Sequence, residues 1–333
     1  MNISIIQGNL SQSFPNRRTE LIALVSVFTF AGATGVLLST SLFLTIIMRP
    51  NLRTGSGILI AHQQLLNVLQ TGIGNPFYIV VGWVVWLGGV SITGINCTAM
   101  HFFCQLFICV ETWSSVFLAV NRFVAIIYPH QYRLISSNAA VAGFITASWC
   151  ISAAIEIPAL LGIGSYFGFR QFDCGYIRVT DHNMVVMHGV VGIWFPLAVQ
   201  ALLYAAIVIN HRQKEEESRI TMVQKKRFKL FRLLFGSYLW YVACYIPFMV
   251  TIYGFPRFWF ADKLRAGWFM VLQEIGYAGS PVFLLLMNKD VMKNAKEGVG
   301  LLRRNMCENN VIAPSSKALS STADSTGLTM RAL

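Results

Sequence analysis

Charged residues are scarce in this sequence. They make up 12% of its 333 residues, whereas soluble domains carry about 25%, and only 14 residues are acidic. The sequence also lacks the alternation of polar and apolar residues that marks the strands of a membrane β-barrel. These absences argue against a water-soluble globule and against a barrel, in agreement with a mean hydropathy of +0.57.

Long apolar runs are what the chain has instead, and hydrophobic residues form 55% of it. A helix needs about 20 predominantly apolar residues to cross a bilayer, and seven stretches are that long. They lie at about 21–48, 56–82, 95–127, 139–161, 184–209, 230–255 and 266–287. The expected fold is therefore all-α, a seven-transmembrane helix bundle formed by residues 21–287.

The segments outside the bundle are short. Residues 1–20 are expected to form an extracellular N-terminus. In 288–304, lysines alternate with apolar residues, which fits a short amphipathic helix on the inner membrane surface. Residues 305–333 are rich in Ser and Thr and are expected to form a disordered cytoplasmic tail. Cys307 in this tail is a candidate for palmitoylation, and an unmodified cysteine without a function is equally consistent with the sequence.

The basic residues are unevenly distributed between the two sides of the bundle. With the N-terminus outside, the inner side holds all but seven of the 26 Lys and Arg. The positive-inside rule then predicts a multi-pass plasma-membrane protein with a cytoplasmic C-terminus. The net charge of +12 thus reflects topology and not a nucleic-acid partner. The basic run 225–229 fits contact with anionic lipid or an acidic partner, or snorkelling charges at a helix end. The polar stretch 210–229 also predicts that the fifth and sixth helices extend beyond the membrane.

The side expected to be extracellular carries candidate modification sites. Two N-glycosylation sequons begin at Asn2 and Asn9 and lie on this side. Of the seven cysteines, the topology places only Cys97 and Cys174 outside. A disulfide between them is therefore expected, and it would hold the outer loop over the bundle.

Span three ends in the triplet Asn121, Arg122 and Phe123. Cys97 lies 25 residues before Arg122, or about 37 Å along a helix, so the two residues lie at opposite membrane faces. Further motif residues occur in order along the chain. They are Leu52-Arg53-Thr54, Asn67, Pro76, Pro129, Trp149, Pro158, Pro196, Tyr204, Cys244-Tyr245-Ile246-Pro247 and Pro281. In this set, over about residues 21–305, the chain resembles the rhodopsin-like (class A) G-protein-coupled receptors.

Several positions depart from the pattern of that family. Asn121 replaces the acid of the triplet, and Arg227 stands where many relatives hold an acid near the start of span six. Asn67 replaces the usual buried aspartate of span two, whereas Glu111 adds a carboxyl to span three. Tyr245 stands at a switch position that is usually Trp. These departures are similar to those of divergent invertebrate receptors, including nematode-type chemosensory and orphan members.

The resemblance implies a function and the residues that perform it. An extracellular small molecule or short peptide would bind in the outer half of the bundle, and a heterotrimeric G protein would bind on the cytoplasmic side. Arrestin and a receptor kinase are further partners that the tail would serve, and no enzyme activity is expected. The residues implied in coupling and activation are Asn121, Arg122, Phe123, Tyr204, Arg227, Tyr245, Pro247 and Pro281.

Ligand contacts are expected on the inner faces of spans three, five, six and seven. The candidates are Cys104, Gln105, Ile108, His188, Phe248, Met249, Ile252 and Glu274. For each of them, a core position or an internal hydrogen bond is the alternative. Cys104 cannot neutralise an ammonium group, so an amine ligand is disfavoured unless Glu274 takes that role. Light sensing is disfavoured because no lysine lies between Lys263 and Lys289 for a retinal Schiff base. A neutral odorant and a short peptide both remain open.

Three acidic residues lie within the spans, where a charge costs at least about 2.5–3.5 kcal/mol. Glu111 and Asn67 are predicted to hold a sodium ion or a proton, and a protonated Glu111 that is hydrogen-bonded to Asn67 is the structural alternative. Glu156 is expected to face neighbouring helices, and Glu274 the ligand. No other cofactor and no metal centre are expected, because the histidines lack metal-ligand spacing on one helix face.

Two other classes of membrane protein were weighed against a receptor. A small transporter or channel would use the intramembrane acids as an ion or proton path and often carries inverted repeats, and the sequence shows no repeat. Such a protein also leaves Arg122, Cys97 and Cys174 unexplained. An intramembrane enzyme lacks support because the sequence has no His-Glu-x-x-His, paired-Asp or Gly-x-Ser-x-Gly motif.

Overall fold

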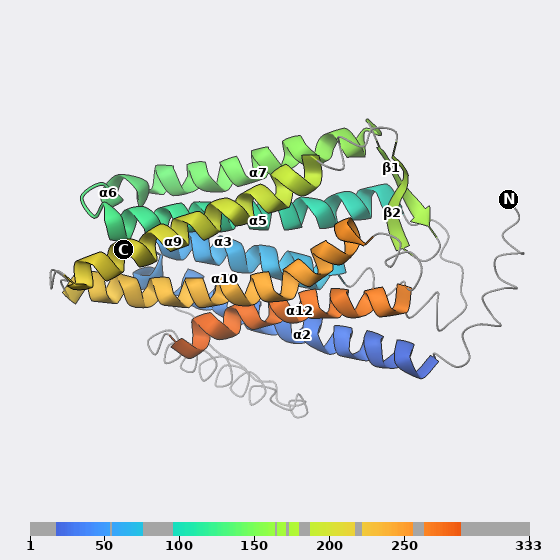
Figure 1. Cartoon of the computed structure of the whole chain (residues 1–333), viewed down its shortest axis with the longest axis horizontal. Helices are drawn as coiled ribbons and strands as arrows, with labels where there is room; N and C mark the ends of the chain where they lie inside the picture. Colours follow the sequence, from blue (N-terminus) through green and yellow to red (C-terminus); the bar gives the residue numbers. More distant parts are fainter. Residues whose placement is uncertain are drawn as a thin grey trace, which may run out of the picture.

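A computed structural model describes most of the bundle. The described residues are 18–53, 55–75, 96–163, 165–170, 173–179, 187–216, 222–255 and 263–287. Within them lie seven long helical segments (Figure 1). These are α2 (Arg18–Met48), α3 (Gly55–Leu69) with η3 (Gln70–Gly74), α5 (Cys97–Ile127), α7 (Asn138–Leu160), η5 (His188–Trp194) with α9 (Phe195–Glu216), α10 (Met222–Gly254) and α12 (Lys263–Met287). The short elements are η2 (Pro50–Leu52), α6 (Tyr132–Ile135), β1 (Ser165–Arg170) and β2 (Asp173–Val179).

The helices follow the predicted apolar stretches closely. The predicted extension of the fifth and sixth helices is present, because α9 continues to Glu216 and α10 begins at Met222. The second predicted span is described only as far as residue 75. The amphipathic helix predicted at 288–304, the tail, and the sites at Asn2, Asn9 and Cys307 lie outside the described residues.

Local sequence signals set the helix ends. The side chain of Asn96 accepts a hydrogen bond from the backbone N–H of Ala99 at the start of α5, and Ser137 does the same for Ala140 at the start of α7. Such caps satisfy backbone donors that have no partner within the helix. Beyond the end of α7, Gly162 adopts a φ of 75°, which a residue without Cβ tolerates best.

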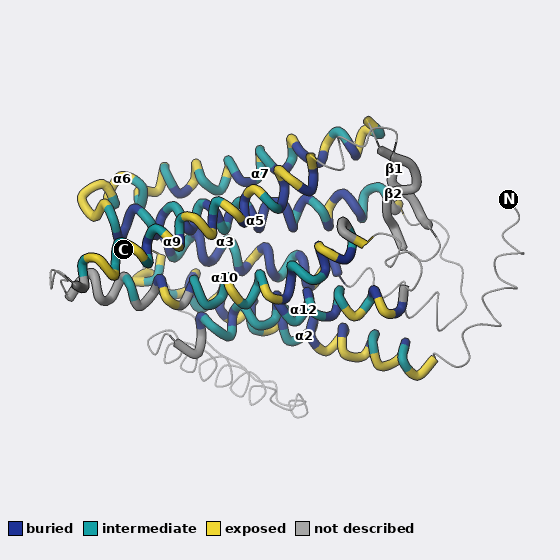
Figure 2. Tube along the Cα trace, in the orientation of Figure 1, coloured by how far each residue is buried: buried dark blue, intermediate teal, exposed yellow. Residues whose placement is uncertain are grey.

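The helix α5 lies at the centre of the bundle. It contacts α3, α7, α9 and α10, and 61% of the residues in its most apolar stretch are buried, against 28–39% in four other helices. The pairs α2 with α3, α2 with α12, and α10 with α12 close the bundle around it. Buried residues line the interior of the bundle along its whole length (Figure 2).

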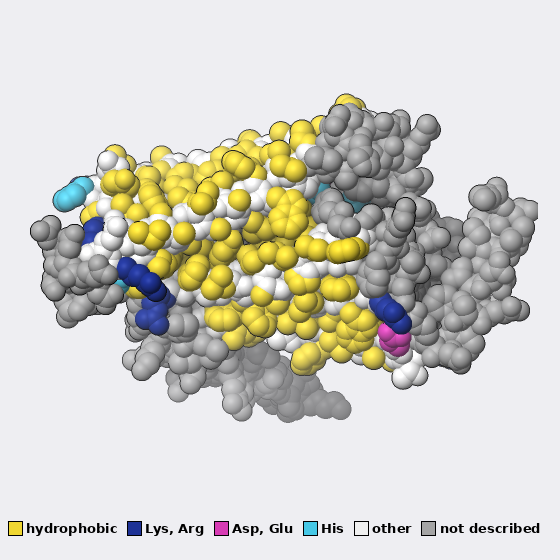
Figure 3. All heavy atoms as spheres, in the orientation of Figure 1, with side chains coloured by type: hydrophobic (Ala, Val, Ile, Leu, Met, Phe, Trp, Pro, Cys, Tyr) yellow, Lys and Arg dark blue, Asp and Glu magenta, His cyan; other side chains and the backbone are white. Residues whose placement is uncertain are grey.

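The outside of the bundle is apolar. Apolar side chains cover the middle of the face seen in Figure 3, and the coloured charges lie near its two ends. Five of the described helices are long and apolar enough to cross a membrane. Ser and Thr within the helices satisfy their own hydroxyls, as where Thr29 donates to the carbonyl of Val25 and Ser152 to that of Ser148, a local bond that removes a buried polar cost. The chain is a multi-pass membrane protein.

A β-hairpin caps one end of the bundle, and the sequence analysis did not foresee it. Strands β1 and β2 pair antiparallel, with Phe169 opposite Cys174. Both strands contact α5, and β1 also contacts α7. This places the strand that carries Cys174 against the helix that begins at Cys97. The side chains of both cysteines lie outside the described residues, so their disulfide stays a prediction. We call this the hairpin end and the opposite end of the bundle the Arg122 end.

Candidate functional site

At the Arg122 end, the predicted coupling residues lie on the buried side of α5. Asn121 is fully buried and Arg122 is only 4% exposed, while Phe123 is partly buried. From α9, the Tyr204 hydroxyl lies near enough to interact electrostatically with Arg122. The guanidinium of Arg122 is therefore buried near the end of the central helix. Arg227 lies in α10, and its side chain is outside the described residues.

Nearer the hairpin end, apolar predicted ligand contacts come together in one cluster. Ile108 of α5 packs with Phe248 and Met249 of α10, and Ile252 lies against them. Tyr245, two residues before Pro247, belongs to the same cluster and is 1% exposed. The cluster joins α5, η5, α9, α10 and α12 through further residues. These are Ile193, Leu197 and Ala266. The predicted apolar contacts thus share one environment.

The polar ligand candidates instead bond to neighbouring helices. The Cys104 thiol donates to the carbonyl of Gly74 in η3 at 3.5 Å. The Nδ1 atom of His188 lies 2.5 Å from the carboxylate of Glu156 in α7, and both residues are buried. Glu156 thus faces a neighbouring helix, as predicted, but its partner there is His188, a predicted ligand contact. Gln105 is partly buried.

Glu274 is fully buried between three helical segments. Its carboxylate accepts a hydrogen bond from the Asn75 side chain, and Gln70 donates to Asn75 in turn at 2.9 Å. Its other oxygen lies close to Gly32 of α2, where a Cβ would come within 3.0 Å. The side chain therefore points toward α2 and η3.

A proline explains the π-helix η5 beside this cluster. Pro196 has no N–H to donate to the carbonyl four residues earlier, which belongs to Gly192. The Thr112 hydroxyl of α5 donates to that carbonyl at 2.8 Å, and the Cys109 thiol lies at 3.8 Å. The wider π turn and this bond from α5 together keep the buried carbonyl satisfied. This hydrogen bond joins η5, which begins at His188, to the central helix α5.

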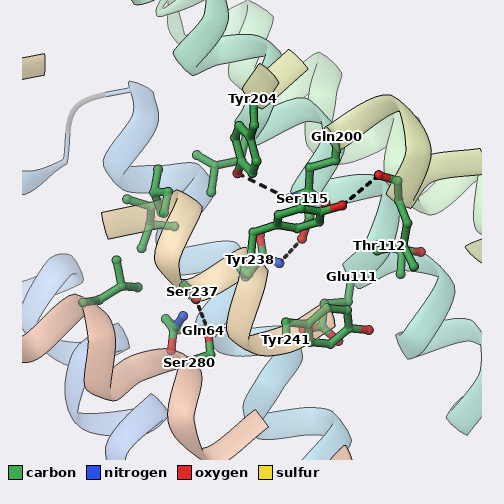
Figure 4. Close-up of a pocket in the computed structure, with 16 residues that line it drawn as sticks. Gln64, Glu111, Thr112, Ser115, Gln200, Tyr204, Ser237, Tyr238, Tyr241 and Ser280 are labelled. Atoms are coloured by element: carbon green, nitrogen blue, oxygen red, sulfur yellow. Dashed lines mark hydrogen bonds between the residues drawn. The ribbon is translucent and has the colours of Figure 1, made fainter. Parts of the chain in front are cut away.

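Between the apolar cluster and the Arg122 end lies a polar cavity of about 50 Å³ (Figure 4). Glu111 lines it together with residues from five helices. The polar ones are Gln63, Gln64, Thr112, Ser115, Gln200, Tyr204, Ser237, Tyr238, Tyr241 and Ser280. Several hydrogen bonds cross it, as where Gln63 donates to Ser115 and Ser237 pairs with Ser280 at 3.1 Å. A volume of this size holds a few water molecules.

Buried polar atoms gather around this cavity without protein partners. In the described part of the chain, one carboxylate oxygen of Glu111 and the amide oxygens of Gln63 and Gln64 form no hydrogen bond. Neither side-chain atom of Asn67 forms one. Buried polar atoms in folded proteins usually have a hydrogen-bond partner, either a protein group or ordered water. Asn67 is not among the residues that line the cavity, so span two presents Gln63 and Gln64 to Glu111.

Comparison with known proteins decides the family. The model of the 7 transmembrane receptor (rhodopsin family) matches residues 39–261. The chain belongs to this family. It is 26% identical over 211 residues to rhodopsin of Sardina pilchardus, which covers 57% of this chain and 59% of that protein. It is 26% identical to rhodopsin of Gallus gallus over 51% of each chain. It is 27% identical to the D(3) dopamine receptor of Mus musculus over 43% of this chain and 32% of that receptor.

Membership in the rhodopsin family confirms the predicted fold and class. The family is one of seven-helix membrane receptors and not of enzymes, in agreement with the helices described above. The chain spans about three fifths of the length of the first of these relatives. The activity, ligand and partners of this rhodopsin-family chain are therefore treated as proposals below.

Sequence reasoning missed two features of this rhodopsin-family bundle. One is the amide-lined wall of the cavity, for which the adjacent Gln63 and Gln64 within an apolar span were a usable signal. The other is a link between three helices. The Trp149 indole donates to Nε2 of His62 at 3.1 Å, which leaves Nδ1 of that ring to donate to Ser114 at 3.0 Å. An indole is only a donor, so it fixes the tautomer of His62.

Proposed function

We propose that this chain is a G-protein-coupled receptor. It binds an extracellular small molecule or short peptide near the apolar cluster and activates a heterotrimeric G protein at the Arg122 end, which would face the cytoplasm. The observation that carries the proposal is the placement of Arg122, buried on the central helix beside Tyr204, in a chain of the rhodopsin family.

The helix α10 supplies the moving part. Pro247 lies within this helix, where it removes a backbone hydrogen bond and weakens the helix locally. Tyr245 and Met249, on either side of Pro247, belong to the apolar cluster. A ligand that packs there favours one of two orientations of the part of α10 that lies toward the Arg122 end. An outward swing would give the G protein access to Arg122.

The test is agonist-dependent GTPγS binding. Membranes with the receptor and a promiscuous G protein are screened against odorants, short peptides and amines. An agonist is expected, and Arg122→Ala should abolish its effect on GTPγS binding while the receptor still reaches the membrane. Arg18→Ala, an exposed arginine at the far end of α2, is the matched control and should respond like the parent. Full coupling by Arg122→Ala would contradict the proposal.

The site favours a ligand that is largely apolar. The cluster around Ile108 is built of aliphatic and aromatic side chains, the usual lining of a small-ligand site. Cys104 carries no charge to pair with an ammonium group, and its thiol already bonds to η3. The absence of lysine between Lys263 and Lys289 argues against a Schiff-base chromophore. A chemosensory role for a neutral ligand is consistent with these features and stays a prediction.

Glu111 is proposed as a cation or proton site, supported by the unsatisfied oxygens around it. Carboxylate and amide oxygens suit a hard cation such as sodium. Agonist affinity in sodium chloride is compared with that in choline chloride. Sodium should lower agonist affinity in the parent and have no effect in Glu111→Gln. Glu274→Gln, which changes another buried acid of the bundle interior, should keep the sodium effect. A sodium effect that survives in Glu111→Gln would refute the site.

The remaining expectations follow from the proposed topology. The N-terminus would be extracellular and glycosylated at Asn2 and Asn9, the protein would lie in the plasma membrane, and Cys97 would pair with Cys174. Arrestin and a receptor kinase would act on the Ser- and Thr-rich tail, and Cys307 would carry a palmitoyl group.

A further inference from the structure

A buried histidine and a buried acid pair with each other near the hairpin end of the bundle. The Nδ1 atom of His188 in η5 lies 2.5 Å from a carboxylate oxygen of Glu156 in α7, so the two groups interact directly. Glu156 is 1% exposed and His188 is 6% exposed. Neither residue lines the cavity around Glu111 or belongs to the apolar cluster. The pair is thus a separate site, which the proposed receptor function does not use.

Three helical segments meet around this pair. The segment η5 contacts both α5 and α7. A Cβ at Gly192, four residues after His188, would lie 3.0 Å from Cys109 Sγ and 3.9 Å from Nδ1 of His188. Glycine at this position therefore lets α5 and η5 approach each other beside the pair. The side chains of His188 and Glu156 form the polar link from η5 to α7.

Titratable groups on the central helix do not neutralise the pair. From α5, the Cys109 thiol interacts with Glu156, but a thiol supplies no positive charge. Glu111 of the same helix lines the polar cavity instead. The helix α9, which continues from η5, has no acidic or basic residue before residue 211. The charge of Glu156 is therefore balanced from within the pair.

The other neighbours of α7 lead to the same result. From α3, His62 accepts a hydrogen bond from the Trp149 indole, and Trp149 lies seven residues before Glu156, or about 10 Å along the helix. The strand β1 also contacts α7, and its side chains lie outside the described residues. In the part of the chain that the structure describes, His188 is the one ion-pair partner of Glu156.

The pair is neutral at one proton count only. It is then either a histidinium beside a carboxylate or a neutral imidazole beside a carboxylic acid, and these two forms differ in the position of a single proton. One proton more or one proton fewer leaves a net charge in the bundle interior, where an uncompensated charge is costly. The closed contact therefore favours the neutral count.

Separation of the two side chains changes that count. Above about pH 6.5, a solvated histidine is mostly neutral and a solvated carboxyl group is charged. The separated groups together then hold one proton fewer than the closed pair. Closing the contact thus takes up a proton in this range, and by linkage a lower pH favours the closed contact. The gain ends below about pH 6.5, where solvated histidine also binds the proton.

We propose that His188 and Glu156 form a proton-binding site, which joins η5 to α7 when it takes up one proton. Ile193 of η5 belongs to the apolar cluster, so proton uptake would also fix one wall of that cluster. The proton site does not depend on receptor activity, whereas any effect of the proton on a ligand rests on the proposed function.

The experiment follows η5 while the pH changes. A trifluoromethyl label is placed on Val190→Cys of η5, an exposed position, in a chain with Cys150→Ser and Cys307→Ser. Fluorine NMR spectra are recorded in lipid nanodiscs, without ligand or G protein, at about pH 8 and about pH 6, on either side of the value for free histidine. The signal should shift between the two conditions, and the thermal midpoint should be higher at the lower pH.

The double variant Glu156→Gln with His188→Gln tests whether the pair causes this response. Its two amides can still hydrogen-bond, but they exchange no proton, so the label should give the same signal at both pH values. The thermal midpoint should lose the corresponding part of its pH dependence. Glu156→Gln alone removes the charge that retains the proton and should also abolish the shift, which keeps the test usable if the double variant does not fold.

Two controls make the result specific to this site. His130→Gln changes an exposed histidine and should keep the response of the parent. A label on Ile209→Cys, an exposed position farther along α9, should show no shift. A pH-independent signal in the parent, a parent-like shift in the double variant, or an equal shift at residue 209 would overturn the proton site. Because neither measurement uses a ligand or a G protein, failure of the proposed receptor function would leave this result unaffected.

Discussion

The two sides of α10 are joined to the bundle by different means. On one side, α12 presents glycines to α10, and a Cβ at Gly276 would lie 2.8 Å from the Cβ of Cys244. The same helix meets α2 in a similar way, since a Cβ at Gly35 would lie 3.4 Å from the Cα of Ala278. On the other side, α9 meets α10 through side chains: the Tyr204 ring lies against Phe231, Phe235 and Tyr238, and aliphatic residues of α9 such as Ile207 pack beside them.

The difference distinguishes a fixed interface, with α12, from an interface that side chains fill, with α9. Backbones that touch through glycines leave no room for rearrangement, because protein interiors are packed to the density of organic crystals. On the side of α9 the two backbones lie further apart, and aromatic and aliphatic side chains fill the space between them. The helix α10 thus meets α12 through closely approaching backbones and α9 through side chains.

The largest expected effect comes from disturbing the fixed interface. Gly276→Ala would place a methyl group against Cys244, whose Cβ cannot move without its backbone. Overpacking of this kind costs about 1–3 kcal/mol, so the thermal midpoint of the purified receptor should fall clearly.

Gly143→Ala is the control for this prediction. A Cβ at Gly143 would meet nothing within 4 Å, and both glycines lie within helices. The general gain in helix propensity, about 1 kcal/mol or less, is then common to both variants. If Gly276→Ala were as stable as Gly143→Ala, the close contact of α10 with α12 would not restrict packing.

The helices themselves were readable from the sequence because each span needs its own apolar run. Counting along those runs also placed Arg122 at the opposite end of α5 from Cys97. Helical counting fixes the face on which a residue lies, but not how that helix is rotated against its neighbours. His188 and Glu156 were therefore assigned separately, although the structure pairs them.

Irregular backbone was the second limit of the sequence. The π turns of η3 and η5 shift the phase of the residues around them relative to a regular helix, and a 3.6-residue pattern does not reveal such a shift. Glu274 illustrates the effect of neighbouring helices. Its position in span seven predicts a ligand contact, but its carboxylate accepts a hydrogen bond from Asn75 at the end of η3. The missing N–H of Pro196 was a visible sign of the irregular turn in η5.

A smaller effect is expected from removing one hydrogen bond on the side of α9. Tyr238→Phe keeps the ring beside Tyr204 but removes the hydroxyl that donates to the Leu197 carbonyl. Loss of this hydrogen bond should cost about 0.5–1.5 kcal/mol. Hydrogen–deuterium exchange should become faster in residues 222–235 and stay unchanged where α10 contacts α12. Tyr128→Phe, at a half-exposed tyrosine outside the helices, is the control. Equal acceleration along the whole of α10 would show that the two sides are not independent.

The smallest effect is expected where the fixed interface borders the cavity. Ser237 of α10 and Ser280 of α12 pair at 3.1 Å, and both line the cavity. A double-mutant cycle with Ser237→Ala and Ser280→Ala, read from thermal unfolding, should give a coupling of about 0.6 kcal/mol, as for other hydrogen bonds between membrane helices. Water in the cavity can replace either hydroxyl, which keeps each single loss small. A coupling of about 2 kcal/mol or more would mean that no water reaches this pair. The unsatisfied oxygens around Glu111 would then need a different explanation from hydration.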